Sequence, residues 1–412
     1  MYDVIIVGAG TAGLASAVYT SMNNQNLKIM LLEKESKCGR KLSASGNGKC
    51  NITNSEWSFN CYSSDNEAFI DDFVSKHNPN EIIRFFELLG IPLYEKNGYY
   101  YPFSNMAKQV TSILIDELDR RKVSIVCDAK VTRIRYEENE RRYYVYANNM
   151  GSKPIECKNI ILALGSNASP KLGGSDTLDI IKKLEISTVP FVPSLCPIYV
   201  EDDLLKIAKG VRVDGKVNIC VGKKIYSESG QVQFNDNNLS GIALMNLSKY
   251  VYDLKGDEFK DALFIELLPE YSWDKLKEYI ICTINIFMKR SVINMLDGFL
   301  PHQLSVYILR RLKLDENMRI GDLPDKQINR LTSCIKMLNF TPKLYEDYDK
   351  AQVSLGGVKL KEIDADTFES RKYPGLYIVG EVLDMTGKCG GYNISFAILS
   401  AIAASRNILG DL

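Results

Sequence analysis

The sequence predicts an α/β protein with a parallel sheet, in which a first domain is interrupted by an inserted module. The main observation is the apolar run at residues 4–7, which leads directly into Gly8-x-Gly10-x-x-Gly13 and a helical pattern. Strands and helices alternate to about residue 188, and the pattern resumes after about residue 345. Because 412 residues are too many for one simple core, two or three domains are expected.

The composition indicates an ordinary globular protein without excess charge. Lys and Arg total 51, Asp and Glu total 51, and 45% of the residues are hydrophobic. This balance gives no support to a nucleic-acid partner or an acidic membrane surface. The N-terminus lacks a basic leader, and no stretch reaches about 18 consecutive apolar residues. We therefore expect a cytoplasmic protein with no signal peptide and no membrane span.

The cysteines and histidines give no indication of disulfides or metals. The ten cysteines contain no Cys-x-x-Cys pair, so reduced thiols are expected in the absence of a secretion signal. The only histidines are His77 and His302. Neither a histidine-based metal site nor a catalytic triad is therefore predicted.

The first glycine motif predicts a dinucleotide site. Gly8 allows a tight turn, Gly10 allows a pyrophosphate to approach the backbone, and Gly13 allows close packing of the helix at 12–22. The start of that helix presents free N–H groups to phosphates. The next strand ends in Glu33, at the spacing of about 20 residues where an acid binds the ribose hydroxyls. The alternative is a glycine turn without a ligand.

A stretch rich in Gly, Ser and Asn follows at 34–54, and it is interpreted as a long functional loop. Arg40 and Lys41 can bind phosphate oxygens. Gly46 and Gly48 allow backbone amides to approach a ligand. The alternative is a solvated basic loop.

The remainder of the first domain continues as helices and strands. The expected elements are helical segments at 67–86 on either side of Asn78-Pro79, a hairpin around 96–98, a helix at 105–121, strands at 123–127, 130–134 and 142–147, and a buried strand at 159–166 that ends in glycine.

The composition shifts after about residue 188, and 189–344 is interpreted as an inserted substrate-side module. Short β-like pieces occupy 200–234, and helices are expected at 241–252, 272–290 with Ser272 as N-cap, 301–312 and 324–338. The module is thus β-rich at about 189–240 and helical at about 241–344. The first domain comprises 1–188 and 345–412.

The C-terminal segment indicates which dinucleotide is bound. A strand is predicted at 375–381, a glycine turn at 387–391 and a helix at 392–408. One glycine motif predicts one dinucleotide, either NAD or FAD. A sheet completed from the far end of the chain favours FAD, extended along its full length. Gly390-Gly391 would then lie at the flavin N1/O2 edge, where the helix dipole stabilises negative charge.

Longer motifs carry a family resemblance. They are Gly8 to Gly13 with Glu33-Lys34, Gly39 to Leu42, Ser45 to Asn51, Gly98 to Pro102, Ala163 to Gly165, Ser240-Gly241, Ser354 to Val358, and Gly375 to Asn393. On these residues the sequence resembles the HI0933-like (BaiN-type) family of FAD-dependent NAD(P)/FAD oxidoreductases. The resemblance implies a Rossmann-like FAD-binding domain of the two-dinucleotide-binding-domain flavoprotein type. It also implies that the insert is a β-barrel-like module followed by a helical one.

The resemblance also implies cofactor contacts. Val131 would meet the adenine through its backbone, Glu381 would lie along the ribityl-pyrophosphate, and the amides of Asn393 and Ile394 would face the flavin pyrimidine. The residues predicted to bind FAD are Gly8, Ala9, Gly10, Thr11, Ala12, Gly13, Glu33, Lys34, Gly39, Arg40, Lys41, Ser45, Gly46, Asn47, Cys50, Asn51, Val131, Ala163, Leu164, Gly165, Gly380, Glu381, Gly391, Tyr392, Asn393 and Ile394.

The sequence departs from the family pattern at Lys49, Tyr99, Cys389 and Ser395, where relatives usually carry Arg, Arg, Thr and Gln. Lys49 keeps a charge but loses the bidentate fork of an arginine. Tyr99 removes a charge. These departures affect the expected identity of the substrate more than the expected binding of FAD.

The leading functional hypothesis is a FAD-dependent reductase or dehydrogenase. Activities in the family include reduction of steroid-like enones, among them bile-acid intermediates, and an amine-oxidase assignment. Hydride would pass via flavin N5 to a small hydrophobic substrate, with NAD(P)H or an electron-donor protein as the electron source. The alternatives are an amine oxidase using O₂, a flavoprotein that modifies or binds RNA, and an NAD-only dehydrogenase.

Two further hypotheses concern individual side chains. Tyr392 is the nearest candidate by motif for a catalytic acid, although a tyrosine at a helix start is also common in packing. Cys50 and Cys389 are either a redox pair or two unrelated buried thiols.

Overall fold

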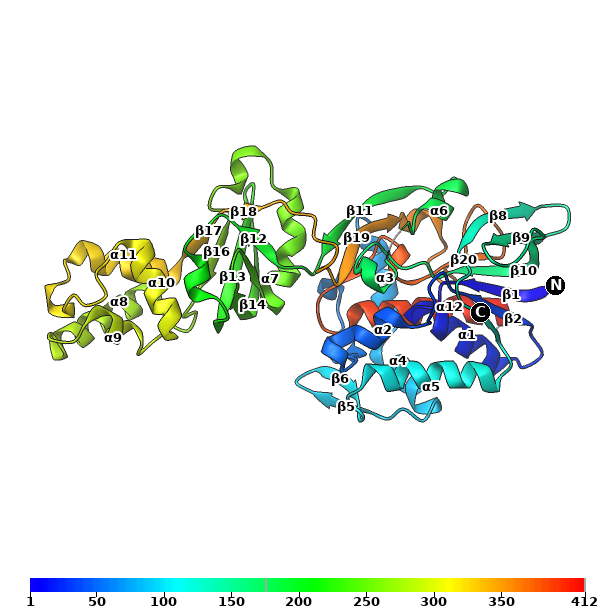
Figure 1. Cartoon of the computed structure of the whole chain (residues 1–412), viewed down its shortest axis with the longest axis horizontal. Coiled ribbons are helices and arrows are strands. Elements are labelled where there is room, and N and C mark those ends of the chain that lie inside the picture. The colour runs from blue at the N-terminus through cyan, green and yellow to red at the C-terminus, as the bar shows by residue number, and fades with distance from the viewer. Residues whose placement is uncertain (175, 411–412) are drawn as a thin grey trace. The chain divides into compact units, whose positions relative to one another are not determined.

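The computed structural model describes residues 1–174 and 176–410, which divide into two compact units. The first unit combines Met1–Pro193 with Tyr348–Leu412, and the second is Ser194–Asp347. In Figure 1 the first unit carries the blue and red ends of the chain, and the second is its green-to-yellow middle. Each unit has its own hydrophobic core.

The first unit is built on a seven-stranded sheet in the order β7-β2-β1-β10-β9-β8, with β20 also paired to β10. Its strands are β1 (Tyr2–Val7), β2 (Ile29–Leu32), β7 (Ser124–Val126), β8 (Val131–Glu137), β9 (Arg142–Ala147), β10 (Ile155–Leu162) and β20 (Leu376–Ile378). All pairs are parallel except those of β8 with β9 and β9 with β10. The predicted α/β fold with a parallel sheet is confirmed.

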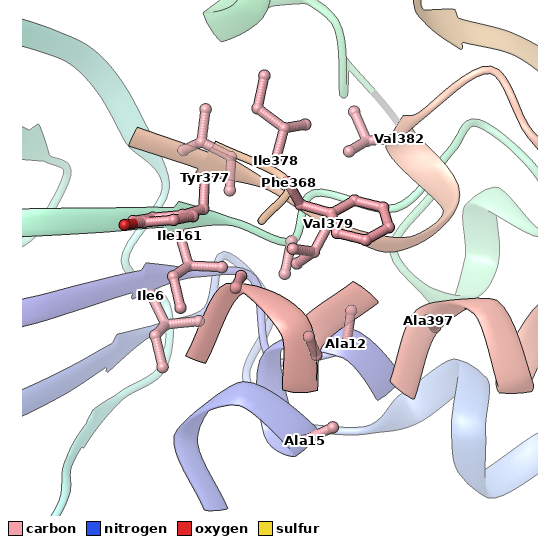
Figure 2. Packing of buried hydrophobic residues seen from close by; sticks show 14 of the residues in the cluster. Ile6, Ala12, Ala15, Ile161, Phe368, Tyr377, Ile378, Val379, Val382 and Ala397 are labelled. Atoms are coloured by element: carbon pink, nitrogen blue, oxygen red, sulfur yellow. The ribbon is translucent and has the colours of Figure 1, made fainter. Parts of the chain in front are cut away.

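Helices α1 (Thr11–Asn23) and α12 (Tyr392–Leu409) pack against each other although they come from opposite ends of the chain. Small residues line both helices, and the Ser405 hydroxyl donates a hydrogen bond to the Ser16 carbonyl at 3.5 Å. Figure 2 shows Ala12 and Ala397 among larger core residues such as Ile6 and Ile161. Small side chains allow the helix backbones to approach closely, which fixes the C-terminal segment beside the N-terminal turn.

The other helices of the first unit are α2 (Arg40–Ala44), α3 (Glu67–Lys76), α4 (Pro79–Leu88), α5 (Ala107–Arg120) and α6 (Asp179–Lys183). The expected break at Asn78-Pro79 is confirmed, because Asn78 forms a capping box with Glu81. The prediction that 34–54 lacks structure of its own was wrong. Its middle forms α2 and a 3₁₀ turn, Ser45–Gly48, because Leu42 is buried in the core.

Three small sheets complete the first unit. They pair β3 (Thr53–Asn54) with the hairpin of β5 (Leu93–Lys96) and β6 (Tyr99–Pro102), β4 (Tyr62–Ser63) with β21 (Thr386–Gly387), and β11 (Thr188–Ser194) with β19 (Val353–Val358). The hairpin is confirmed, and its turn places Asn97 and Gly98 at φ values of 55° and 87°. Positive φ at both positions is typical of a two-residue hairpin turn.

The second unit contains an antiparallel sheet in the order β17-β16-β13-β14-β15-β12-β18. Its strands are β12 (Ile198–Val200), β13 (Arg212–Val221), β14 (Lys224–Phe234), β15 (Asn238–Ser240), β16 (Leu263–Glu266), β17 (Leu338–Phe340) and β18 (Pro342–Lys343). Only Thr341 separates the two edge strands β17 and β18, so the sheet curls back on itself. The short β pieces predicted at 200–234 are mainly one long hairpin, because β13 and β14 pair along their full length.

The helices of the second unit are α7 (Ile242–Leu247), α8 (Trp273–Ile286), α9 (Val292–Leu296), α10 (His302–Leu312) and α11 (Asp325–Lys336). Ser272 caps α8 by accepting a hydrogen bond from the Lys275 N–H, as predicted. The helix expected at 241–252 continues after α7 only as a 3₁₀ turn, Ser248–Asp253, and α8 ends before 290. The sequence pattern did not indicate the single-turn helix α9.

Candidate functional site

The N-terminal turn has the geometry that its three glycines predict. A Cβ on Gly8, at φ 98°, would lie 2.3 Å from the Ala163 carbonyl oxygen, and a Cβ on Gly13 would lie 1.8 Å from the Gly8 carbonyl oxygen. Both positions therefore exclude a side chain. A Cβ on Gly10 would meet nothing within 4 Å. That open space is what a ligand close to the backbone requires.

Glu33 is held at the end of β2 by backbone donors. Its Oε2 accepts a hydrogen bond from the Ala9 N–H at 2.7 Å, and its Oε1 accepts one from the Glu35 N–H at 2.9 Å. An ionised carboxylate can accept about four hydrogen bonds, so acceptor capacity remains for two ribose hydroxyls. The turn thereby fixes the acid where the sequence predicts a ribose.

A cavity of about 330 Å³ opens at this turn. Most of its lining comes from residues within 7–10, 32–41, 129–132, 163–168 and 172–183, together with Asn148. The predicted cofactor residues on its wall are Gly8, Ala9, Gly10, Glu33, Lys34, Gly39, Arg40, Lys41, Val131, Ala163, Leu164 and Gly165. The structure thus brings together residues that are far apart in the sequence.

The basic residues of the cavity have partners on the protein. Arg40 forms an ion pair with Glu35 and donates to the Lys171 carbonyl at 2.6 Å. Lys41 Nζ lies 2.6 Å and 2.9 Å from the two carboxylate oxygens of Glu381. Lys41 therefore holds Glu381 in place. Because its ammonium group has three N–H donors, it can also face a phosphate.

Ser166 is a polar residue of this site that sequence reasoning missed. Its hydroxyl donates to Glu381 Oε1 at 2.7 Å, so Glu381 is held from two sides. Its position directly after Ala163-Leu164-Gly165 was the available signal. Gly380, at φ 74°, places this carboxylate beside α1, since a Cβ on Gly380 would lie 2.9 Å from the Ala12 Cβ.

The second glycine turn, at the start of α12, is built against a distant segment. A Cβ on Gly391, at φ 95°, would lie 2.7 Å from the Thr53 backbone nitrogen. The Asn54 side-chain amide donates to the Gly390 carbonyl at 3.2 Å, and the Ser395 hydroxyl donates to the Thr53 hydroxyl oxygen at 2.9 Å. The residues around 53 and 391 therefore form one structure although they lie far apart in the chain.

Asn393 has an internal role in that turn. Its Oδ1 accepts from the Gly387 N–H and its Nδ2 donates to the Gly387 carbonyl, both at 2.8 Å. The side chain closes the turn and leaves the first-turn N–H groups of α12 to other acceptors. The segment Ser45–Asn51 is equally compact, because a Cβ on Gly46 would lie 2.8 Å from the Asn51 nitrogen.

Tyr392 is a packing residue by its surroundings. It is 3% exposed, and its ring meets the Tyr62 ring edge-to-face at 5.8 Å. Burial and a hydrogen bond with Cys61 raise the pKa of its phenol well above the ordinary value. A hydroxyl so placed cannot exchange protons readily with a bound molecule. Tyr99 is more exposed than Tyr392, and burial, with Cys389 and Glu56 nearby, raises its pKa.

Cys50 and Cys389 differ in exposure, since Cys50 is buried and Cys389 is partly exposed. Cys50 is fully buried at φ 61°, and burial raises the pKa of its thiol to about 11. The neighbouring Asn51 Oδ1 is buried, and no hydrogen-bond partner on the protein is found for it among the described residues. Such an acceptor needs a donor from water or a ligand.

The residues present fit a dinucleotide with its pyrophosphate at α1. Neither α1 nor α12 has a side-chain cap or an acidic residue in its first turn, so both present N–H groups to an anion. Open space over Gly10, the fixed Glu33 carboxylate and the orphaned Asn51 oxygen are consistent with a long ligand. In the described part of the chain, no helix is long and apolar enough to cross a membrane.

The comparisons with known proteins cover nearly the whole chain. The family description "HI0933-like protein Rossmann domain" matches residues 2–407. A 3-dehydro-bile acid delta(4,6)-reductase of Clostridium scindens is 28% identical over 98% of both chains. A ribosomal RNA dihydrouridine synthase of Haemophilus influenzae is 30% identical over 98% of both chains, and one of Escherichia coli is 28% identical over 99% of this chain and 98% of its own.

Solved structures show the same fold at low identity. A 3-ketosteroid-delta4-(5alpha)-dehydrogenase of Rhodococcus jostii has a TM-score of 0.50 at 11% identity, over 98% of this chain and 96% of its own. The Escherichia coli quinol fumarate reductase subunit FrdA also has a TM-score of 0.50, at 16% identity, over 100% of this chain and 70% of its own. At these identities the likeness concerns the fold alone.

Proposed function

We propose that the chain, which belongs to the HI0933-like protein Rossmann domain family, reduces a carbon–carbon double bond conjugated to a carbonyl group. As a family member it is a FAD-dependent oxidoreductase. The observation that carries the proposal is the chemistry common to its relatives. A 3-dehydro-bile acid with a Δ4 bond and the uracil ring of uridine both contain a C=C bond conjugated to a carbonyl. The carbonyl group polarises such a C=C bond, so the bond can accept a hydride.

The cofactor would extend from the first glycine turn to the second. Gly8 to Gly13, the Glu33 carboxylate and the backbone of Val131 would hold its adenosine diphosphate half, and Lys41 with Glu381 would face the pyrophosphate and ribityl chain. The amides at the start of α12 and the segment Ser45–Asn51 would hold the ring end. FAD, when bound, supplies two-electron hydride chemistry at its ring.

The chain's own residues would set the polarity of the reaction. The N-terminus of α12, with no acidic residue in its first turn, would favour negative charge on a ring bound there. Asn393 keeps that N-terminus open by closing the turn at Gly387. A proton must also reach the substrate. Because Tyr392 is buried behind Tyr62 and Cys61, we infer that another donor or water delivers it.

A small hydrophobic enone is the substrate class we favour. The balanced charge of the chain, 51 basic and 51 acidic residues, supports a neutral molecule over a polyanion. A uridine in ribosomal RNA is the second candidate, supported by the two dihydrouridine synthases among the relatives. We propose NAD(P)H as the electron donor and the cytoplasm as the place where the protein acts.

The test begins with the purified protein and its flavin content. NADH and NADPH are then compared under anaerobic conditions for their ability to bleach the flavin spectrum. A steroidal 4-ene-3-one, an undermodified ribosomal RNA and a primary amine are compared next. If the enone reoxidises the reduced flavin, the proposal is supported. If the RNA reoxidises the reduced flavin and dihydrouridine forms, the second candidate is supported. Flavin bleached by the amine, with peroxide released in air, contradicts both.

A further inference from the structure

Two thiols that are 89 positions apart in the sequence meet at the edge of the cavity. Cys38 Sγ and Cys127 Sγ lie 3.7 Å apart, and both side chains are partly exposed. Neither cysteine belongs to the glycine motifs. No Cys-x-x-Cys spacing marks them, so only the folded chain brings them together.

Both cysteines lie within two positions of residues that line the cavity. Lys37 and Gly39, which flank Cys38, are on its wall, and so is Ala129, two positions after Cys127. Backbone hydrogen bonds already join the two segments, from the Ala129 N–H to the Glu33 carbonyl at 2.8 Å and from the Asp128 N–H to the Glu35 carbonyl at 3.0 Å. A covalent bond between the thiols would join the same two walls.

We propose that Cys38 and Cys127 form a reversible disulfide that ties these two cavity-lining segments together and slows release of the cofactor. The disulfide itself follows from the thiol geometry, whereas its effect on the cofactor rests on the proposed function. The disulfide is a modification site outside the flavin chemistry, and its state would set how firmly the cofactor is retained.

The local backbone allows the bond to form. A disulfide requires the sulfurs to approach to about 2.05 Å, so the two side chains must together move by roughly 1.7 Å. Cys38 lies in a turn and Cys127 in a bend, not inside a strand or helix. Each is followed by a residue with positive φ, Gly39 at 66° and Asp128 at 55°. Side-chain rotation and small backbone shifts in these turns can supply the movement.

Hydrogen peroxide is an oxidant that balances the reaction. The thiolate of one cysteine attacks the peroxide, which gives a sulfenic acid and hydroxide. The second thiol then attacks the sulfenic sulfur, the S–S bond forms and water leaves. Overall, two thiols lose two electrons and two protons, and peroxide becomes two waters.

The surroundings of Cys38 affect the rate of this oxidation. Burial, with Cys127 as a neighbour, raises the pKa of the Cys38 thiol to about 12. Because the thiolate is the reactive form, the small fraction of Cys38 thiolate near neutral pH slows formation of the disulfide. The pair should accordingly respond to sustained peroxide rather than to a brief exposure.

The experiment uses the FAD-loaded protein, reduced and then treated with hydrogen peroxide. Free thiols are alkylated, and peptides are mapped by mass spectrometry. We expect a linked pair of peptides containing Cys38 and Cys127, two hydrogens lighter than the separate peptides. FAD release, followed by the rise of flavin fluorescence after dilution, should slow about tenfold on oxidation and recover with dithiothreitol.

The variants C38S and C127S are compared with C282S, which removes an exposed thiol on α8. Only C282S should retain the linked peptide and the slow release. Absence of the linked peptide from the oxidised wild type overturns the disulfide, and equal release rates with the link present overturn its effect on the cofactor. A protein that binds no FAD but still forms the link contradicts the proposed function and leaves the disulfide standing.

Discussion

The two glycine turns of the first unit both precede a helix that has no side-chain cap, but the turns are built in different ways. The turn at Gly8 to Gly13 joins consecutive elements, β1 and α1, and its close contacts lie within the turn itself or at Ala163, directly after the neighbouring strand β10. The turn at Gly390-Gly391 depends on Thr53 and Asn54, more than 300 positions away. The first is a local motif, and the second exists only when the fold is complete. Substitutions at the two turns should therefore fail in different ways.

The largest effect is expected from Gly13→Ala. Its methyl group would lie 1.8 Å from the Gly8 carbonyl oxygen, which belongs to the backbone and cannot move aside. We expect a loss of about 4 kcal/mol in the free energy of unfolding and no retained flavin. Urea unfolding and flavin absorbance measure the two effects.

Gly10→Ala is the matched control in the same turn, because its methyl group meets no protein atom within 4 Å. It should fold with nearly normal stability but bind flavin at least about tenfold more weakly, if the open space serves the pyrophosphate. Normal flavin affinity in this variant would remove that role from Gly10.

Gly391→Ala tests the second turn. A side chain at φ 95° is strained, and its methyl group would lie 2.7 Å from the Thr53 nitrogen. We expect a loss of about 3 kcal/mol in unfolding free energy, together with loosening of the segment around Thr53. Gly48→Ala, at φ 84° with open space, carries the strain without the clash and should lose only about 1 kcal/mol. Hydrogen exchange at 50–54 separates the two variants.

Lys41 and Glu381 form an ion pair and should act as a unit. Lys41→Met leaves the Glu381 carboxylate without its ion pair, and we expect flavin affinity to fall by about 1 to 2 kcal/mol. Glu381→Gln should lower flavin affinity by a similar amount, since it also removes the ion pair while the contact with Ser166 would remain. Flavin titration of the two single variants and the double variant gives the coupling energy. Strictly additive losses would mean that the pair does not act on the cofactor together.

Asp384, in the segment that follows Gly380, gives the stability of the protein a pH dependence. Burial, followed by the nearby Asp65, raises the pKa of Asp384 from 3.8 to about 6. Since the folded state holds the proton more tightly than the unfolded state, this contribution to stability is present below about pH 4. It is lost as the pH rises to about 6 and amounts to about 1 to 2 kcal/mol after solvent screening. Thermal unfolding between pH 4 and 7 should show this loss, and Asp384→Asn should abolish it.

The smallest effect is expected from Tyr392→Phe. The hydroxyl is buried and faces Cys61, so its removal should change turnover less than about twofold and stability by about 1 kcal/mol. A loss of turnover of a hundredfold or more, with folding intact, would establish Tyr392 as the proton donor. The pH profile of kcat would then lose its basic limb.

Elements with local signals were predictable from the sequence. Four features have a sequence signal that lies within a few residues. They are the apolar run before Gly8, the Asn78-Pro79 break, the turn at Asn97-Gly98 and the Ser272 cap. Glu33 was placed by its spacing from the glycines and lies on the cavity wall. The parallel sheet followed from the alternation of such elements.

Other features had no local signal. Helix α2 forms in a stretch rich in Gly, Ser and Asn because the core buries Leu42, and intrinsic propensity is too weak to predict that. The long pairing of β13 with β14 depends on the partner strand more than on either sequence. The contact of Ser166 with Glu381 joins residues that no spacing rule connects.

By itself, the sequence determined the fold class, the family and the first glycine turn, because these depend on contiguous backbone geometry. The tertiary structure alone decided how the second glycine turn is assembled, that Tyr392 is a buried packing residue, and that Cys38 meets Cys127. Those facts depend on contacts between distant segments. Such contacts form only when the cooperative core has closed around them.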